Sequence, residues 1–390
     1  MKKRICLIAP KFINYIGGVE THAYEFDKWF SNNKNYGIAT IITLKKVKDG
    51  IKVKRKKISS TNTRVVDELT NNFDEDLKII LSNSPKDTAI YFFNSTNSIP
   101  IINKLVKKRK NAKIILRSGG TDIVAGWIGD ENNKSKDILE NRKFITEVIN
   151  NSVDCLIVNS KFSEKRCLDI GINKNKIKVI TGGVDCNRYR PVLKKDSNKI
   201  NFLHVSRFVE CKGTVFLLEA FKKAIGKTKK ELRLTLVGDG PQRKAIEESI
   251  KRLDLEPSVT LTGAIKVEDV SNYFNMADIF VHLPITLLRK ERGGQYEHVE
   301  SMGRVFCEAT AAGIPSIAFS VGGVPEVVDD NRTGFLLKEG DMDGASEKMA
   351  LLADNPSLRK DLGRNARERA LKEFDWDIIF NKYLEIFNDK

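Results

Sequence analysis

The stretch from Glu300 to Gly323, which reads ESMGRVFCEATAAGIPSIAFSVGG, decides the fold that we predict for this chain. Gly313 should end a short helix, because glycine adopts the left-handed cap cheaply, and Pro315 two residues later cannot continue the helix. The apolar run 316–320 then predicts a strand, which the following glycines interrupt. A chain that repeats such helices and strands is typical of an α/β protein with parallel sheets.

Two carboxylates in this stretch indicate the chemistry. Glu300 should lie in a loop at the helix N-terminus, and Glu308 about one turn inside the helix. Free backbone N–H groups at the helix start, together with the helix dipole, favour an anion such as a phosphate. Because a carboxylate repels a phosphate, Glu300 should bind neutral hydroxyls instead. The combination suits a sugar joined to a diphosphate.

The acidic pair resembles the E-x7-E motif of retaining glycosyltransferases with the GT-B fold, particularly glycosyltransferase family 4. Taken alone, the pair could equally be two glutamates on a surface helix. The resemblance implies that Glu300 contacts the donor sugar and Glu308 the nucleotide ribose. It also implies donor contacts from the residues at the helix start, which are Ser301, Met302, Gly303, Arg304 and Val305.

The composition fits a globular chain of two domains. Its 390 residues are 41% hydrophobic and 30% charged, enough for two cores. No apolar run reaches the length of a membrane-spanning helix. The start MKKRICLIAPKF reads as a first strand and not as a signal peptide, and the six cysteines form no C-x-x-C pair. We therefore expect reduced thiols and a cytoplasmic protein.

The net charge of +16 is carried by the first 200 residues. Two basic clusters, Lys45–Lys57 and Lys104–Lys113, suggest a peripheral contact with an anionic membrane surface. Lysine-rich composition and solvated faces are an equally open explanation. The clusters have no interleaved aromatic residues, which argues against single-stranded nucleic acid.

The first half offers two further candidate positions. Gly17 and Gly18 follow the strand Ile5–Ala9, where a glycine pair lets the backbone approach a phosphate. The family often carries a histidine after the strand that here ends at Leu116, but this chain has Ser118-Gly119 there. Asp122 is our candidate for the missing catalytic group, although it could instead cap the next segment.

The second half carries the motifs of the nucleotide site. Arg207 and Lys212-Gly213 follow the strand Asn201–Val205 and resemble the family's diphosphate clamp, since arginine grips a phosphate with two donors and lysine adds a point charge. Gly238 belongs to a VGDGP sequence that resembles the family's VGxGP. Ala264 and Ile265 follow the next strand and should contact the base.

Two other stretches of the second half need an interpretation. The charged stretch from Ile285 to Glu297 reads as a mobile loop over the site. The D-x-D sequence at Asp341–Asp343 is the metal signature of another glycosyltransferase fold, but its position indicates a helix N-cap.

We therefore predict an α/β protein with the GT-B fold: two Rossmann-like, doubly wound domains facing a cleft, with a C-terminal helix that crosses back to the first domain. The predicted boundaries are residues 1–190 for the acceptor domain, 200–373 for the donor domain and 374–390 for the returning helix. Residues Cys186–Lys199 should form the linker.

The predicted activity is that of a retaining hexosyltransferase that moves a sugar from a UDP-linked donor to a glycan or lipid-linked acceptor in cell-surface polysaccharide or glycoconjugate synthesis. Arg207, Lys212 and the helix N-terminus would stabilise the departing diphosphate. No metal, other cofactor or nucleic acid is expected. A nucleotide-sugar epimerase or a phosphorylase with the same fold is the alternative, and a basic nucleic-acid-binding protein fits the charge but not the glycine loops.

Overall fold

The computed structural model describes residues 2–9, 18–43, 64–67, 73–120, 122–125, 137–192, 197–291 and 294–389. The chain divides into two compact units. The first comprises Met1–Thr181, Leu288–Glu297 and Phe380–Lys390, and the second comprises Gly182–Leu287 and His298–Ile379. Gly17 and the basic cluster Lys45–Lys57 lie outside the described residues.

The first unit is built on a seven-stranded sheet with the order β3-β2-β1-β4-β5-β6-β7. Its pairs are parallel. The strands read as continuous apolar runs because both faces of such a sheet are covered by helices. The strands are β1 (Lys3–Ala9), β2 (Tyr36–Thr43), β3 (Arg64–Asp67), β4 (Thr88–Phe93), β5 (Lys113–Arg117), β6 (Cys155–Val158) and β7 (Ile177–Val179).

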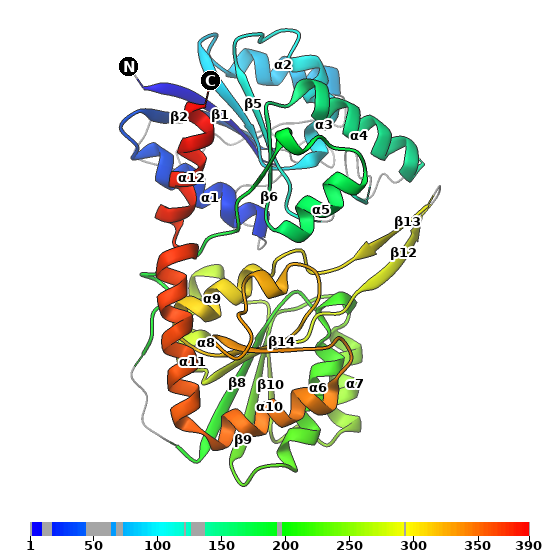
Figure 1. The fold of residues 1–390 in the computed structure, drawn as a ribbon, viewed down its shortest axis with the longest axis vertical. Helices are drawn as coiled ribbons and strands as arrows, with labels where there is room; N and C mark the ends of the chain where they lie inside the picture. Colours follow the sequence, from blue (N-terminus) through cyan, green and yellow to red (C-terminus); the bar gives the residue numbers. More distant parts are fainter. Residues whose placement is uncertain are drawn as a thin grey trace. The chain divides into compact units, whose positions relative to one another are not determined.

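In the described part of the first unit, the helices between these strands are α1 (Gly18–Ser31), α2 (Phe73–Asn83), α3 (Ile99–Leu105), α4 (Ile138–Ser152) and α5 (Lys161–Asp169). The end of the last helix, α12 (Trp376–Asn388), belongs to the same unit and lies beside α1 and β2 (Figure 1). Tyr383 is fully buried there, and its hydroxyl lies 2.9 Å from Nε2 of His22. Its ring packs against Phe26 and Phe92. The chain thus returns to the first unit through an aromatic core.

The second unit repeats the same topology with six strands in the order β10-β9-β8-β11-β14-β15. In both sheets the first strand of the unit lies in the middle and the order reverses beside it, as in a doubly wound fold. The strands are β8 (Lys199–Val205), β9 (Glu231–Val237), β10 (Val259–Gly263), β11 (Ile279–His282), β14 (Ser316–Phe319) and β15 (Gly334–Leu337). Two doubly wound units confirm the predicted fold class.

The helices of the second unit are α6 (Thr214–Ile225), α7 (Arg243–Arg252), α8 (Val270–Met276), α9 (Arg304–Ala312), α10 (Met342–Asp354) and α11 (Pro356–Arg369). Asp341 caps α10 by accepting a hydrogen bond from the N–H of Gly344 at 2.8 Å, as expected for the D-x-D sequence. All six cysteines are free and buried.

The prediction of a linker from Cys186 to Lys199 is wrong at its start. The second unit begins at Gly182, and Cys186 and Tyr189 are buried in it. The carbonyl of Tyr189 accepts a hydrogen bond from Arg367 at 2.8 Å. This segment carries few apolar residues at any regular spacing, so its packing could not be recognised from periodicity.

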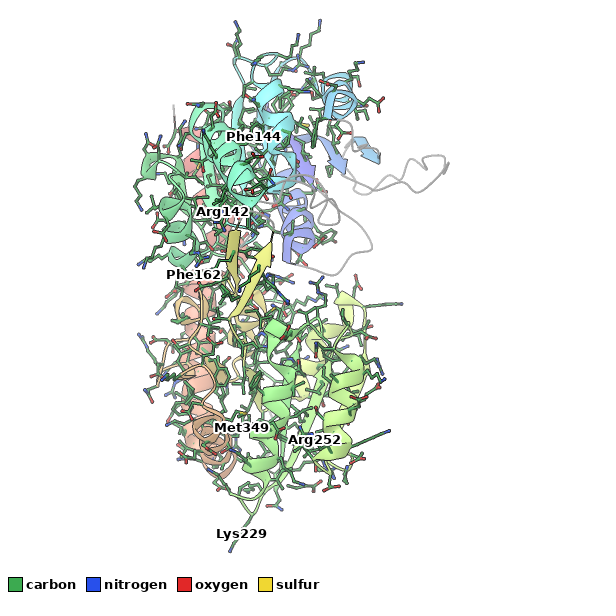
Figure 2. All side chains as sticks on the ribbon, turned by 90° about the vertical axis from the view of Figure 1, so that its right-hand side faces the viewer. Arg142, Phe144, Phe162, Lys229, Arg252 and Met349 are labelled. Carbon is green, nitrogen blue, oxygen red and sulfur yellow. The ribbon has the colours of Figure 1, made fainter. Side chains whose placement is uncertain are left out.

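The prediction of an irregular loop from Ile285 to Glu297 is also wrong, whereas its mobility stays a prediction. Most of it forms a two-stranded sheet, β12 (Leu287–Glu291) with β13 (Gly294–His298), and Leu288–Glu297 groups with the first unit. Tyr296 packs with Ala125 and Ile138. Arg142, which lies beside the hairpin in Figure 2, donates to the carbonyl of Gln295 at 3.1 Å. The alternation of an exposed Gln295, a buried Tyr296 and an exposed Glu297 is a strand pattern that the charge of the segment obscured.

Gly213, which precedes α6, provides a sharp test of this fold. Its φ is +65°, and a Cβ there would lie 1.7 Å from the carbonyl oxygen of Leu283. We expect Gly213→Ala to cost more than the roughly 1–2 kcal/mol of a left-handed alanine, because the contact adds to it. Gly226, at the other end of α6, has φ of −76° and its nearest such contact at 3.7 Å. Urea denaturation should show a change of at most about 1 kcal/mol for Gly226→Ala, and equal losses for the two variants would contradict this description.

Candidate active site

Glu300 and Lys212 form an ion pair at the carboxyl end of the second sheet. Lys212 follows β8 and ends a short turn before α6, and its Nζ donates to Oε2 of Glu300. The backbone of Glu300 is held as well, because its carbonyl accepts from the N–H of Gly323 at 3.0 Å. Gly322 has φ of +53° and approaches that carbonyl so closely that a Cβ would lie 2.0 Å from it. Gly322 and Gly323 therefore fix the position of the Glu300 backbone.

The ion pair is partly shielded from water, with 26% of the Lys212 side chain and 12% of the Glu300 side chain exposed. Burial alone would raise the pKa of Glu300, but the Lys212 ammonium and His282 hold that pKa well below its usual value. Burial lowers the pKa of Lys212, and the Glu300 carboxylate more than offsets this, so the pKa is raised overall. Both groups are therefore charged at neutral pH.

The contribution of the Glu300–Lys212 ion pair to the stability of the fold should depend on pH. The folded-state pKa of Glu300 lies below its unfolded value of about 4.3, so the stabilisation is complete above that value and is lost as pH falls towards the folded pKa. The melting temperature of the natural chain minus that of Glu300→Gln should be constant from pH 7 to about pH 5 and shrink below it. A difference that stays constant down to pH 3 would contradict this assignment.

Glu308 lies inside α9 and is buried. Its Oε1 lies 3.1 Å from an Nη atom of Arg304, one helical turn earlier. Burial raises the pKa of Glu308, whereas Arg304 and Arg188 act to lower it. Burial also raises the pKa of Tyr189, and the charge of Glu308 adds to that effect. A carboxylate held in this way has its position fixed before any ligand arrives.

The residues predicted at the start of α9 differ in exposure. Ser301, Met302 and Gly303 are buried, and Arg304 and Val305 are half-buried. Sδ of Met302 accepts from the N–H of Gly182 at 3.1 Å, so the thioether is used for packing in this structure. Gly303 has φ of +77°, which lets α9 begin sharply after Glu300.

The other predicted donor residues gather at the same edge of the sheet. Arg207 is exposed and lies close enough to Lys212 for its charge to act on the pKa of that lysine. Gly238 follows β9 with φ of +139° and bonds through its N–H to the carbonyl of Gly263 at 3.1 Å. Ala264, which is exposed, and Ile265, which is half-buried, come directly after this bridge. The structure thus brings together Glu300, Lys212 and Arg207, with the glycine turn on the neighbouring strands.

The predicted residues of the first unit form a separate polar cluster. Asp122 lies in a turn after β5, where Oδ1 accepts from Oγ of Ser118 at 2.5 Å and Oδ2 accepts from Oγ1 of Thr96 at 2.6 Å. Among the residues that the structure describes, no helix begins at Asp122. Gly18 is exposed and is the first residue of α1.

Two buried histidines of the second unit escaped the sequence reasoning. His282 ends β11 and its Nε2 lies 3.6 Å from Oε2 of Glu300. His204, on the adjacent strand β8, has its Nδ1 3.4 Å from Nδ1 of His282. The available signal was a histidine near the end of each of two apolar strands, which parallel pairing places side by side.

These features define a protein of the GT-B class, and comparisons with known proteins agree. HepE from Anabaena, solved in complex with UDP, has a TM-score of 0.72 at 17% identity over 98% of this chain and 99% of that one. Sucrose-phosphate synthase from Thermosynechococcus elongatus has a TM-score of 0.74 at 21% identity over 99% and 98% of the two chains. At these identities the likeness establishes the fold.

Residues 185–369, just under half of the chain, match the family model described as glycosyl transferases group 1. N-acetyl-alpha-D-glucosaminyl L-malate synthase of Bacillus anthracis is 33% identical over 50% of this chain and 46% of its own length. A GDP-mannose-dependent phosphatidylinositol monomannoside mannosyltransferase of Corynebacterium glutamicum is 27% identical over 70% of this chain and 72% of its own length. The matched regions therefore span from about half to under three quarters of these two relatives. Among the residues that the structure describes, no helix is both long and apolar enough to span a bilayer.

Proposed function

We propose that this chain is a retaining glycosyltransferase that moves a sugar from a UDP-linked donor to a glycan or lipid-linked acceptor in the synthesis of a cell-surface polysaccharide or glycoconjugate. The observation that carries the proposal is the ion pair between Glu300 and Lys212. Glu300 lies just before α9, and the buried Glu308 lies within that helix. The Lys212 ammonium, which can turn to bind a phosphate, thus lies beside the Glu300 carboxylate, which can accept hydrogen bonds from sugar hydroxyls.

The geometry supports a division of roles. Lys212 and the exposed Arg207 are the cations at the sheet edge, and we assign them to the diphosphate, whose negative charge grows as it departs. Glu300 orients the sugar through its hydroxyls, and Glu308 binds the ribose. The proposed reaction needs no metal, so a chelator should leave the rate unchanged.

The names of relatives bear on the donor. HepE was solved with UDP, whereas the mannosyltransferase of Corynebacterium glutamicum is named for GDP-mannose. The same cations would serve either diphosphate, so the base must be read by contacts near Ala264 and Ile265. The alternative of an epimerase or a phosphorylase gains no support from these relatives.

The decisive experiment is a turnover screen with UDP- and GDP-linked sugars, each with and without saccharide and lipid-linked acceptors. We expect one UDP-sugar to be consumed faster with an acceptor, and the NMR coupling of the new anomeric proton to show retained configuration. Consumption of none of the donors, or an inverted product, would refute the proposal. An isomerised donor without transfer would favour the epimerase.

We assign Asp122 of the first unit to the reacting centre, in place of the histidine that the family often carries. Both of its oxygens accept from hydroxyls, which keeps the carboxylate oriented. Asp122→Asn should therefore lower turnover, whereas Ser118→Ala, which removes one of the two hydroxyls, should lower it less.

The basic first unit is proposed to meet an anionic membrane, where lipid-linked acceptors lie. In the cluster Lys104–Lys113, Lys104 pairs with Asp74, and Lys113 donates to the carbonyl of Ile386 at 2.6 Å. The exposed members are Lys107, Lys108 and Lys110. This leaves a smaller basic surface than the sequence suggested.

Replacing these three lysines with glutamate should weaken binding to phosphatidylglycerol vesicles by at least about 100-fold, because each lysine contributes about 1 kcal/mol. High salt should weaken the natural chain in the same way. The same change at Lys222, Lys229 and Lys251, which are exposed in the second unit, is the matched control. Equal losses in the two triple variants would contradict a docking role for the first unit.

A further inference from the structure

The mechanism so far leaves two fully buried histidines of the second unit without a task. His204 on β8 and His282 on β11 are 0% exposed, and their ring centroids lie 4.9 Å apart. They are aligned towards the proposed catalytic pair, because Nε2 of His282 lies 3.6 Å from Oε2 of Glu300. Nε2 of His282 is buried and has no hydrogen-bond partner among the described residues. Buried polar atoms in folded proteins nearly always have a hydrogen-bond partner, so the unpaired Nε2 of His282 calls for an explanation.

The hydrogen bonds of His204 fix its tautomer. Its Nδ1 lies 3.0 Å from the carbonyl oxygen of Val281, and a carbonyl can only accept, so Nδ1 carries the proton. Its Nε2 then accepts from the hydroxyls of Ser206 at 2.8 Å and Thr214 at 3.1 Å. Burial lowers the pKa of His204 and of His282, so both rings are neutral at pH 7.

The tautomer of His282 follows from that of His204. Nδ1 of His282 faces the protonated Nδ1 of His204 at 3.4 Å, and because two N–H groups repel each other at this distance, Nδ1 of His282 carries no proton. A neutral imidazole carries one ring proton, so the proton of His282 is on Nε2. That N–H is aimed at Oε2 of Glu300, the oxygen that also accepts from Lys212.

We propose that His282 is a positioning residue that takes over Oε2 of Glu300 when Lys212 turns from the ion pair to the diphosphate of the donor. Without a second donor, the departure of Lys212 would leave a partly buried carboxylate unpaired, which is costly. The His282 N–H satisfies Oε2 and leaves Oε1 to accept from the sugar. His204 sets the tautomer that makes this possible. This inference rests on the proposed function of the same site.

The first test needs no catalysis. In the natural chain labelled with ¹⁵N-histidine, a long-range ¹H–¹⁵N spectrum at pH 7 should show the Nε2–H tautomer for His282 and the Nδ1–H tautomer for His204. The signals that are missing from the spectrum of the His282→Gln variant are those of the His282 ring, which assigns them. Saturating UDP should move the Nε2–H proton of His282 downfield as its hydrogen bond to Glu300 shortens. An Nδ1–H tautomer or an imidazolium at His282 would overturn the proposal.

The second test uses two amides of different reach. The amide nitrogen of glutamine can replace Nε2, whereas that of asparagine can replace only Nδ1. We expect His282→Gln to keep kcat within about threefold and His282→Asn to lower kcat by about 10–100-fold with a smaller change in donor KM, as for a misplaced reacting group. Equal kcat in the two variants, at equal melting temperatures, would sink the idea. If no nucleotide sugar is turned over by the natural chain, the proposed function fails while the spectrum still decides the tautomer.

Discussion

Lys212→Ala is expected to lower turnover by about 10²–10³-fold, the usual effect of one lost donor to a developing oxyanion. The loss should fall mainly on kcat, because the diphosphate gains its charge in the transition state and the lysine contributes most there. Steady-state kinetics with the donor found in the screen would measure this. A turnover like that of the natural chain would remove Lys212 from the mechanism.

The control for this prediction lies a short distance along the same segment. Lys223 on α6 is exposed and pairs with Asp343 at 2.7 Å, a surface ion pair that includes none of the predicted donor residues. Lys223→Ala should leave kcat and KM unchanged. Melting temperatures of both variants are needed, because Lys212→Ala also leaves the Glu300 carboxylate without its ammonium.

Tyr383→Ala is expected to destabilise the first unit by about 3–5 kcal/mol, the range for loss of a large buried aromatic side chain. The ring is fully buried and contacts Phe26, Phe92 and Phe380, so truncation would open a cavity in the aromatic core. Urea denaturation followed by tryptophan fluorescence and circular dichroism would measure the loss.

Tyr383→Phe is the matched variant, because it keeps the ring and removes only the hydroxyl that lies 2.9 Å from Nε2 of His22. It should cost about 1–3 kcal/mol, the penalty for an unmade buried hydrogen bond. In both variants the transition of the first unit should move and that of the second should not, since Phe380–Lys390 groups with the first unit. A shift confined to the second unit would contradict the assignment of the helix end.

Local chain chemistry was enough to predict much of the second unit. Gly313 has φ of +68° and ends α9, and β14 follows it as the apolar run indicated. Glu300 and Lys212, 88 residues apart, were assigned to one site because each lies in a motif that resembles one of the family's donor contacts, and their ion pair brings them together. The helix end follows from backbone preference, whereas the shared site was predicted from the resemblance to the family.

What the sequence could not predict depends on neighbours in space. The contact of His204 with His282 arises from the pairing of β8 with β11, and neither position is unusual within its own strand. The hairpin β12–β13 is stabilised by Tyr296 against Ala125 and Ile138, residues more than 150 positions earlier. A pattern that looks polar and irregular along the chain can therefore be ordered by contacts that no local signal reports.

The central claim is that the second unit holds a departing diphosphate with Lys212 and Arg207 while Glu300 faces the sugar. The most direct measurement is a crystal structure of the full chain with UDP bound. We predict phosphate oxygens within hydrogen-bond distance of Nζ of Lys212 and of the Arg207 guanidinium, and ribose hydroxyls on Glu308. A nucleotide bound elsewhere on the chain, with Lys212 still paired to Glu300, would contradict the account.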